Sequence, residues 1–304
     1  MATEALHPPH QSNLAGIGLR LGATVAFGLM AALIKLAHDA GANTAEMVFF
    51  RNLFGMPVIL AWIVWTGTLD AWRTSRPWAH LTRGTLGLAS MALAFGALAL
   101  LPLAEATTIS CVAPLFAVAL SALILKEEVR RHRWTAVGVG FVGVVVVMQP
   151  AGSGLAPVGL TLAILAAIGV AGVTIAIRQI GQTESTQTTV LWFTGFSLLV
   201  SSLFMPFFAQ GHDPYVWVTL LALGLCGGVG QLFLTASLRA APIAVVVPFD
   251  YASLIWAVLL GWLIWDTHPQ ATTWIGAAII VGSGLYTVYR EHKLGRDKPR
   301  PEPL

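Results

Sequence analysis

The segment that decides the fold runs from Trp134 to Ile177 and reads WTAVGVGFVGVVVVMQPAGSGLAPVGLTLAILAAIGVAGVTIAI. It holds no Asp, Glu, Lys or Arg in 44 residues, and a Pro- and Gly-containing stretch, 150–154, lies near its middle. A helix needs about 20 apolar residues to cross the roughly 30 Å hydrocarbon core of a bilayer. The segment therefore predicts two membrane-spanning helices joined by a turn at 150–154.

The composition of the whole chain agrees with a membrane location. Of its 304 residues, 56% are hydrophobic and 10% are charged, and the mean hydropathy is +0.76. Soluble domains average about 45–50% apolar and about 25% charged residues, so this composition excludes a soluble enzyme. Cys111 and Cys226 both lie in apolar runs, which indicates small buried side chains rather than a disulfide or a metal site.

Ten apolar stretches separated by charged or turn-forming clusters predict an all-α membrane protein with ten transmembrane helices. Short tails at 1–13 and 291–304 flank them. The stretches lie at 14–37, 44–66, 80–100, 104–125, 134–149, 157–177, 187–208, 214–236, 242–264 and 271–289.

The distribution of charge predicts the orientation of these helices. With ten spans both termini lie on the same side, and every Lys and Arg except Lys35 and Arg51 then falls on that side. The connections on the other side carry Asp39, Asp213 and Asp266 but no basic residue. Basic residues accumulate in cytoplasmic loops, so we expect an integral plasma-membrane or inner-membrane protein with both termini cytoplasmic. Such an arrangement of charge does not indicate nucleic-acid binding.

The second half of the chain resembles the first. Pro114 within the fourth stretch corresponds to Pro248 within the ninth, and glycines follow a Trp in both the fifth and the tenth stretch. The predicted repeats are 14–150 and 151–290. Because each repeat holds an odd number of spans, the two must be inverted relative to each other, as in many secondary transporters.

Two stretches resemble a known family. Ala241-Pro-Ile-Ala-Val-Val-Val-Pro-Phe-Asp, continuing to Trp262, is similar to the ninth helix of EamA-type carriers, and 113–134 is similar to their passage from the fourth to the fifth helix. These carriers belong to the drug/metabolite transporter superfamily and are built as two inverted five-helix repeats. The resemblance covers about 14–289 and implies transport of amino acids, other small metabolites or vitamins.

Ionisable residues deep within a span are expensive in lipid and indicate a functional site. Asp250 lies eight residues past Pro242, and Arg51 lies eight residues past Asn43, so each is about 12 Å from its end of the span. A pair between Asp250 and Arg51 would frame a substrate site, although Arg51 could equally brace helix carbonyls. The other candidate substrate-binding residues are Tyr251, Trp256, Thr108, Ser110 and Gln231.

Further candidates are helix breaks and gates. Pro114 and Pro248 each free a backbone carbonyl that must find a partner near a cavity. Lys35, Glu46 and Glu105 gather near the outer ends of their spans, where Lys35 and Glu46 would form an outer gate or simply reach the interface. No metal site is expected, because the histidines lie mostly in tails and loops.

These features favour a secondary transporter that works by alternating access, with the lipid bilayer and a small-molecule substrate as its partners. Export of an amino acid or related metabolite is the first expectation, and uptake of a larger aromatic or cationic metabolite, such as a flavin or a sulfonium nucleoside, is the alternative. A passive channel and an intramembrane enzyme are weaker alternatives, the enzyme because the sequence lacks the expected catalytic motifs. No cofactor is expected, because Gly227–Gly230 lacks the Gly-Lys of a nucleotide-binding loop. Small-residue faces suit either helix packing or a homodimer.

Overall fold

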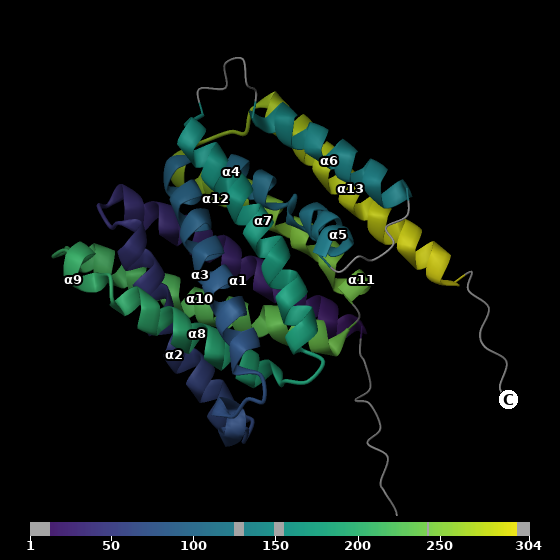
Figure 1. Ribbon diagram of the computed structural model, residues 1–304. Helices are drawn as coiled ribbons and strands as arrows, with labels where there is room; N and C mark the ends of the chain where they lie inside the picture. Colours follow the sequence, from purple (N-terminus) through teal and green to yellow (C-terminus); the bar gives the residue numbers. More distant parts are fainter. Residues whose placement is uncertain (1–12, 125–130, 149–154, 242, 297–304) are drawn as a thin grey trace, which may run out of the picture.

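The computed structural model describes residues 13–124, 131–148, 155–241 and 243–296, and within them the chain forms only helices and their connections (Figure 1). The predicted turn at 150–154, the boundary between the predicted repeats, and the tails up to 12 and from 297 lie outside these residues. The long helices are α1 (Asn13–Asp39), α2 (Thr44–Trp65), α3 (Pro77–Leu100), α6 (Arg131–Met148), α7 (Pro157–Ile180), α8 (Thr186–Ser202), α10 (Pro214–Ala240), α12 (Ser253–Trp265) and α13 (Ala271–Arg296). The shorter elements are η1 (Leu69–Trp72), α4 (Leu103–Ser110), α5 (Ala113–Ile124), α9 (Met205–Phe208), α11 (Ile243–Val246) and η2 (Val247–Ala252).

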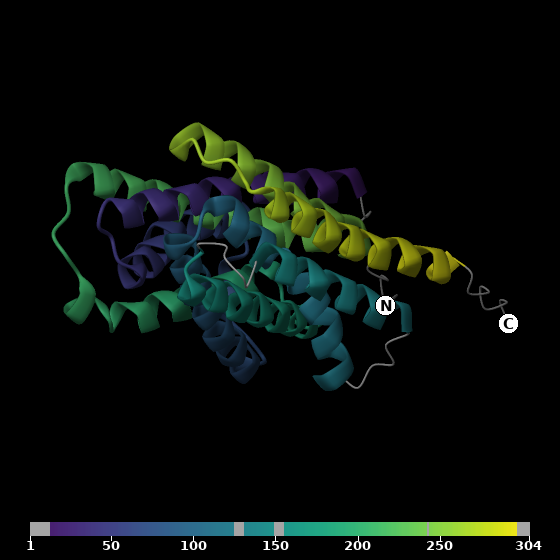
Figure 2. The same cartoon turned by 90° about the horizontal axis from the view of Figure 1, so that it is seen from above.

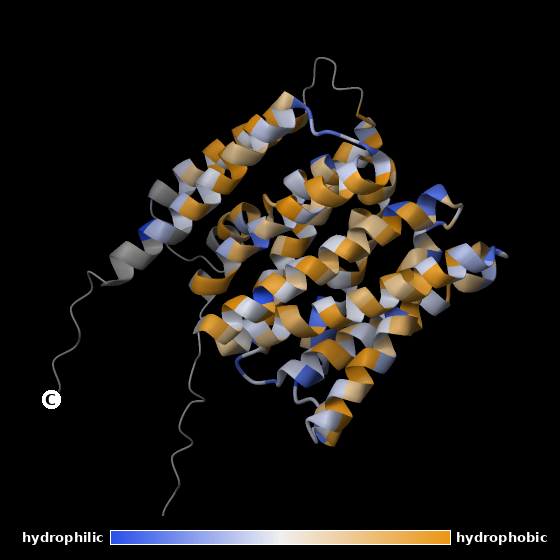
Figure 3. Cartoon of the chain, turned by 180° about the vertical axis from the view of Figure 1, so that it is seen from behind, coloured by the Kyte–Doolittle hydropathy of each residue, from blue (hydrophilic) through white to orange (hydrophobic). Residues whose placement is uncertain are grey.

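The apolar character of these helices confirms the predicted class of all-α membrane protein. Among the described residues, seven helical segments are long and apolar enough to cross a membrane, and Trp134–Met148 and Ala271–Thr287 form shorter apolar helices. Hydrophobic residues are spread along the helices, as Figure 3 shows. In lipid a helix satisfies its own backbone hydrogen bonds, which is why the chain has this form.

Sequence features at the helix starts explain several boundaries. Pro77, Pro157 and Pro214 each occupy the first turn of a helix, where a missing N–H leaves no hydrogen bond unmade. Asn43 caps α2, and the Asn43 and Glu46 side chains each accept a hydrogen bond from the other residue's backbone N–H.

Three spans that the sequence predicts as continuous are broken. The stretch 104–125 divides into α4 and α5, with the break at Cys111 and Val112. The break directly precedes Pro114, whose ring clashes with the carbonyl four residues earlier and whose nitrogen has no N–H. The stretch 187–208 divides into α8 and the single turn α9, which begins beside Pro206.

The predicted ninth span has the most irregular backbone. It consists of α11, the 3₁₀ helix η2 and the longer helix α12. Pro248 lies in the first turn of η2, and Asp250 and Tyr251 follow it within the same 3₁₀ helix. The 3₁₀ helix thus contains Asp250, the acid that the sequence places deepest within a span.

Helix packing follows a pattern that relates the two halves. α1 packs along α10 and α3 packs along α7, while α6 and α13 form a pair at one side of the molecule (Figures 1 and 2). If α1, α2 and α3 correspond to α7, α8 and α10, then the pairs α1–α10 and α3–α7 are equivalent. The pairs α2–α10 and α3–α8 are equivalent in the same way.

The pair α6–α13 depends on two facing glycines. A Cβ atom on Gly276 would lie 2.7 Å from the Gly143 carbonyl oxygen and also against Val147. A Cβ on Gly143 would lie 2.9 Å from the Gly276 carbonyl oxygen. Small residues let membrane helices approach this closely, and close approach maximises van der Waals contact between their backbones.

We therefore expect Gly276→Ala to separate α6 from α13 and to lower the free energy of unfolding by about 1–3 kcal/mol, a typical cost of overpacking. Gly282→Ala is the matched control on the same helix, because a Cβ there meets nothing within 4 Å. Thermal unfolding of the purified protein in detergent, followed by Trp fluorescence, measures both. Equal melting temperatures for the two variants would contradict the proposed close contact.

Candidate functional site

A cavity of about 200 Å³, which we call the central cavity, lies among α1, α3, α4, α7 and α12. Its wall is mostly alanine and other apolar side chains, and its polar groups are the hydroxyls of Thr107, Ser110 and Ser253. No Asp, Glu, Lys or Arg of the described residues lines it. Such a mostly apolar cavity with a few converging polar groups is the usual form of a small-molecule site.

A second cavity, of about 180 Å³, lies beside the loop that precedes α13. Glu105, His268 and Gln270 contribute to its more polar wall. Ala257 of α12 lines both cavities, and α4 also contributes to both. The two cavities are therefore neighbours along α12, the second lying toward the C-terminal end of that helix.

One face of α1 connects the first cavity to the irregular ninth span. Arg20, Thr24 and Gly28 are four residues apart and so lie on the same side of the helix. The guanidinium of Arg20 forms a bidentate ion pair with the Asp250 carboxylate. The Trp256 indole N–H donates to the Thr24 hydroxyl at 3.3 Å, and a Cβ on Gly28 would lie 2.8 Å from the Trp256 Cβ.

This geometry corrects the predicted partner of Asp250, which is Arg20 and not Arg51. Arg20 is one of the basic residues expected on the cytoplasmic side, and its side chain is buried within the bundle, as is that of Arg83. A signal for Arg20 was available, since it lies inside the first apolar stretch, seven residues and about 10 Å from the start of α1.

Arg51 lies instead among polar and aromatic groups of neighbouring helices. Its guanidinium donates to the Asn52 side-chain oxygen at 3.1 Å and to the Gln231 side-chain oxygen at 3.4 Å. It also lies over the Phe193 ring, which Arg83 contacts as well. The predicted candidates Arg51 and Gln231 therefore meet each other, but neither lines the central cavity.

The remaining predicted substrate-binding residues are dispersed. Ser110 lines the cavity while its hydroxyl donates to the Thr107 carbonyl at 2.7 Å. The Thr108 hydroxyl donates within its own helix, to the Ala104 carbonyl. Tyr251 is buried with its hydroxyl against Gly284 and has no hydrogen-bond partner among the described residues.

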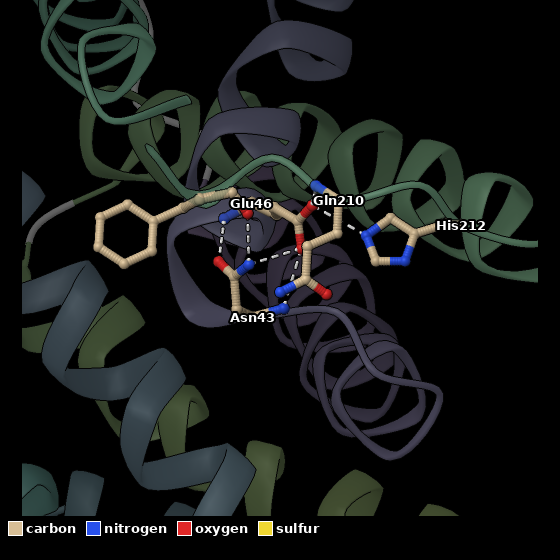
Figure 4. Close-up of polar contacts among 5 residues, drawn as sticks. Asn43, Glu46, Gln210 and His212 are labelled. Carbon is tan, nitrogen blue, oxygen red and sulfur yellow. Dashed lines mark hydrogen bonds and ion pairs between the residues drawn. The ribbon is translucent and has the colours of Figure 1, made fainter. Parts of the chain in front are cut away.

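The structure does not pair Lys35 with Glu46 as a gate. Glu46 is almost fully buried and fastens the start of α2 to the segment before α10 (Figure 4). Its carboxylate accepts hydrogen bonds from the Asn43 backbone and side chain, from the Gln210 backbone at 2.8 Å, and contacts the His212 ring nitrogen at 2.9 Å. Glu46 thus holds a loop in place, because backbone and side-chain groups of the start of α2 and of the segment before α10 are its partners.

The other two predicted gate residues also have separate partners. The Lys35 ammonium donates to the Leu101 carbonyl at 3.4 Å and lies 5.9 Å from the centre of a Trp265 ring. The Glu105 carboxylate accepts from the Thr273 hydroxyl at 3.0 Å and borders the second cavity. Only Glu105 of the three lines either cavity.

Known proteins similar to this chain are membrane transporters. A pseudopaline exporter of Pseudomonas aeruginosa is 30% identical over 88% of this chain and 93% of the relative. An S-adenosylmethionine uptake transporter of Rickettsia prowazekii is 30% identical over 83% of this chain and 85% of the relative. A solved crystal structure shares the fold, with a TM-score of 0.66 and 23% identity over 93% of this chain and 99% of that chain.

The family match covers both halves of the chain. The model of the EamA-like transporter family matches residues 14–149 and again residues 157–289. The chain is therefore an integral, multi-pass membrane protein that belongs to the EamA-like transporter family, and it is a transporter rather than an enzyme.

Proposed function

We propose that the protein is a secondary transporter that works by alternating access between two inverted five-helix repeats, 14–150 and 151–290. The central cavity carries this proposal, because helices of both halves form its wall. The equivalence of the pairs α1–α10 and α3–α7 supports a two-fold relation between the halves. In transporters built from inverted repeats, the substrate binds at the interface between the repeats and one repeat rocks against the other.

The cargo that suits the cavity is a small metabolite without net charge, of about the size of an amino acid. A volume of about 200 Å³ is small beside the roughly 300–1,000 Å³ of typical small-molecule pockets. The wall offers hydroxyls for orientation but no charged side chain among the described residues to balance a net charge. We propose export as the direction, as for the pseudopaline exporter, although the S-adenosylmethionine relative is an uptake transporter.

The alternative, uptake of an aromatic or cationic metabolite, draws on Trp256 next to the cavity wall at Gly28. An indole face attracts planar or cationic ligands. The acid that would complete a cation site is Asp250, and Arg20 already neutralises it. The geometry therefore favours the smaller, uncharged cargo.

We further propose that the Arg20–Asp250 pair closes the cavity on the cytoplasmic side. The pair joins α1 to η2 at a point eight residues, or about 12 Å, from Gly28 toward the N-terminus of α1. Both halves of the chain contribute one partner. Separation of the pair would let the first repeat move relative to the second, and the buried guanidinium of Arg20 would then be exposed to water.

Filling the cavity tests the proposed cargo site. Ala94 of α3 lines the cavity, so we expect Ala94→Leu to exclude cargo while it keeps the helix. If fitting cargo beside the larger Leu side chain costs about 1.4 kcal/mol, cargo binds about tenfold more weakly. Mass spectrometry identifies the amino acids and related metabolites that the parent protein moves in proteoliposomes. Ala61→Leu on the exposed face of α2 is the control, and equal transport by both variants would contradict the site.

Cross-linking tests the proposed cytoplasmic gate. In a protein whose two native cysteines are replaced by Ser, Arg20→Cys and Asp250→Cys are joined by a short, reducible thiol cross-linker. We expect the cross-linked carrier to stop transporting and the reduced carrier to recover, because α1 and η2 must part in every cycle. Each single-cysteine variant, treated in the same way, controls for chemical modification. Undiminished transport by the cross-linked form would show that the pair stays closed throughout the cycle.

Cysteine labelling in intact cells tests the proposed orientation with both termini cytoplasmic. Ser75 and Gly211 are exposed residues at opposite predicted sides of the membrane. In the cysteine-free background we expect a membrane-impermeant maleimide to label Gly211→Cys but to label Ser75→Cys only after the cells are permeabilised. The reverse pattern would invert the topology.

A further inference from the structure

Arg51 and Arg83 form a buried cationic cluster that the proposed cargo cavity does not use. They come from α2 and α3, and their exposed fractions are 5% and 2%. Both guanidinium groups lie against the same ring, that of Phe193 in α8, at 5.7 Å and 3.8 Å from its centre. In the described part of the chain, no carboxylate pairs with either arginine.

Much of the hydrogen-bonding capacity of this cluster is unmet. Arg51 uses two of its nitrogens on Asn52 and Gln231, but its Nε has no partner. Arg83 has no partner at Nε or Nη1. Buried donors normally find partners, since an unsatisfied one costs about 1–3 kcal/mol and more when it is charged.

Further unsatisfied polar groups lie on α8, which carries Phe193, and on α3, which carries Arg83. On α8, the hydroxyls of Thr194 and Ser197 are buried without a partner, and Ser197 is one helical turn from Phe193. On α3, His80 lies one turn from Arg83, and neither of its ring nitrogens has a partner. α8 packs against both α2 and α3, so these groups belong to one region of the bundle.

We propose that this cluster binds a small oxyanion, a carboxylate or phosphate-type group, between Arg51 and Arg83. Two guanidinium groups in a low-dielectric interior repel each other, and burial without a counter-ion is costly for each. The planar fork of an arginine matches the two oxygens of a carboxylate or phosphate. The site lies outside the central cavity, so the proposal does not depend on the identity of the cargo.

The thermal stability of the purified protein tests the site. The chain is reconstituted in nanodiscs of neutral lipid, and sodium formate, sodium phosphate or sodium chloride replaces the bulky sulfonate buffer MES at constant ionic strength. A ligand that binds only the folded state raises Tm with a saturable dependence on its concentration. We expect formate or phosphate to raise Tm by at least about 2 °C, and the larger response identifies a carboxylate or a phosphate as the occupant.

The variant Arg83→Gln shows whether Arg83 binds an anion or only braces the helices. Removal of one of two like charges relieves their repulsion, so we expect this variant to have a higher Tm than the parent in MES and to lose the response to formate and phosphate. Arg51→Gln should behave in the same way. Arg73→Gln, at an exposed position beside Asp70, is the matched control and should respond as the parent does.

Three results would overturn the proposal. The first is a parent protein whose Tm does not change with formate or phosphate, and the second is an equal rise with chloride. The third is an Arg83→Gln variant that is less stable than the parent in MES and still responds to the anions, because Arg83 would then only brace the helices.

Discussion

Lipid offers no hydrogen-bond partner to a backbone amide or to a charge, and the rest of this structure depends on that constraint. It requires a helix for each apolar span and directs the few charged side chains toward protein. Arg20, Arg51 and Arg83 all lie within long helices and are all buried in the bundle. The bilayer also explains the close glycine contact between α6 and α13, since helices in lipid associate through packing rather than through exclusion of water.

Three of the predicted spans are interrupted, and two of these interruptions meet. The break between α4 and α5 lies at Cys111, and the 3₁₀ helix η2 leads into α12 at Ser253. The Cys111 sulfur and the Ser253 hydroxyl are 3.9 Å apart. Ser253 and Ser110 both line the central cavity, so the irregular backbone of each half borders the space proposed for cargo. Irregular backbone at membrane depth is tolerated in such a position because protein or a cavity can satisfy it.

The buried arginines are accommodated in two different ways. Arg20 meets an acid from the other half of the chain, and the pair joins elements that we propose move apart during transport. Among the described residues, Arg51 and Arg83 meet only neutral groups and the face of Phe193, which stabilises a cation far less than a carboxylate does. Arg20 therefore has its counter-ion, Asp250, within the protein. The counter-ion that we propose for Arg51 and Arg83 is an anion from solution.

The sequence alone determined the class of fold, because hydropathy and span length reflect the bilayer and need no knowledge of tertiary contacts. It also marked Pro114 and Pro248, next to which the backbone changes, and the ionisable residues Asp250 and Arg51. Tertiary structure decided which groups meet: Arg20 with Asp250, Glu46 with His212, and Arg51 with Gln231. A linear pattern gives the depth of a residue in a span but not the rotation of its helix against the neighbours. A nearly uniformly apolar helix has almost no hydrophobic side to fix that rotation, so only the packing of the whole bundle sets it.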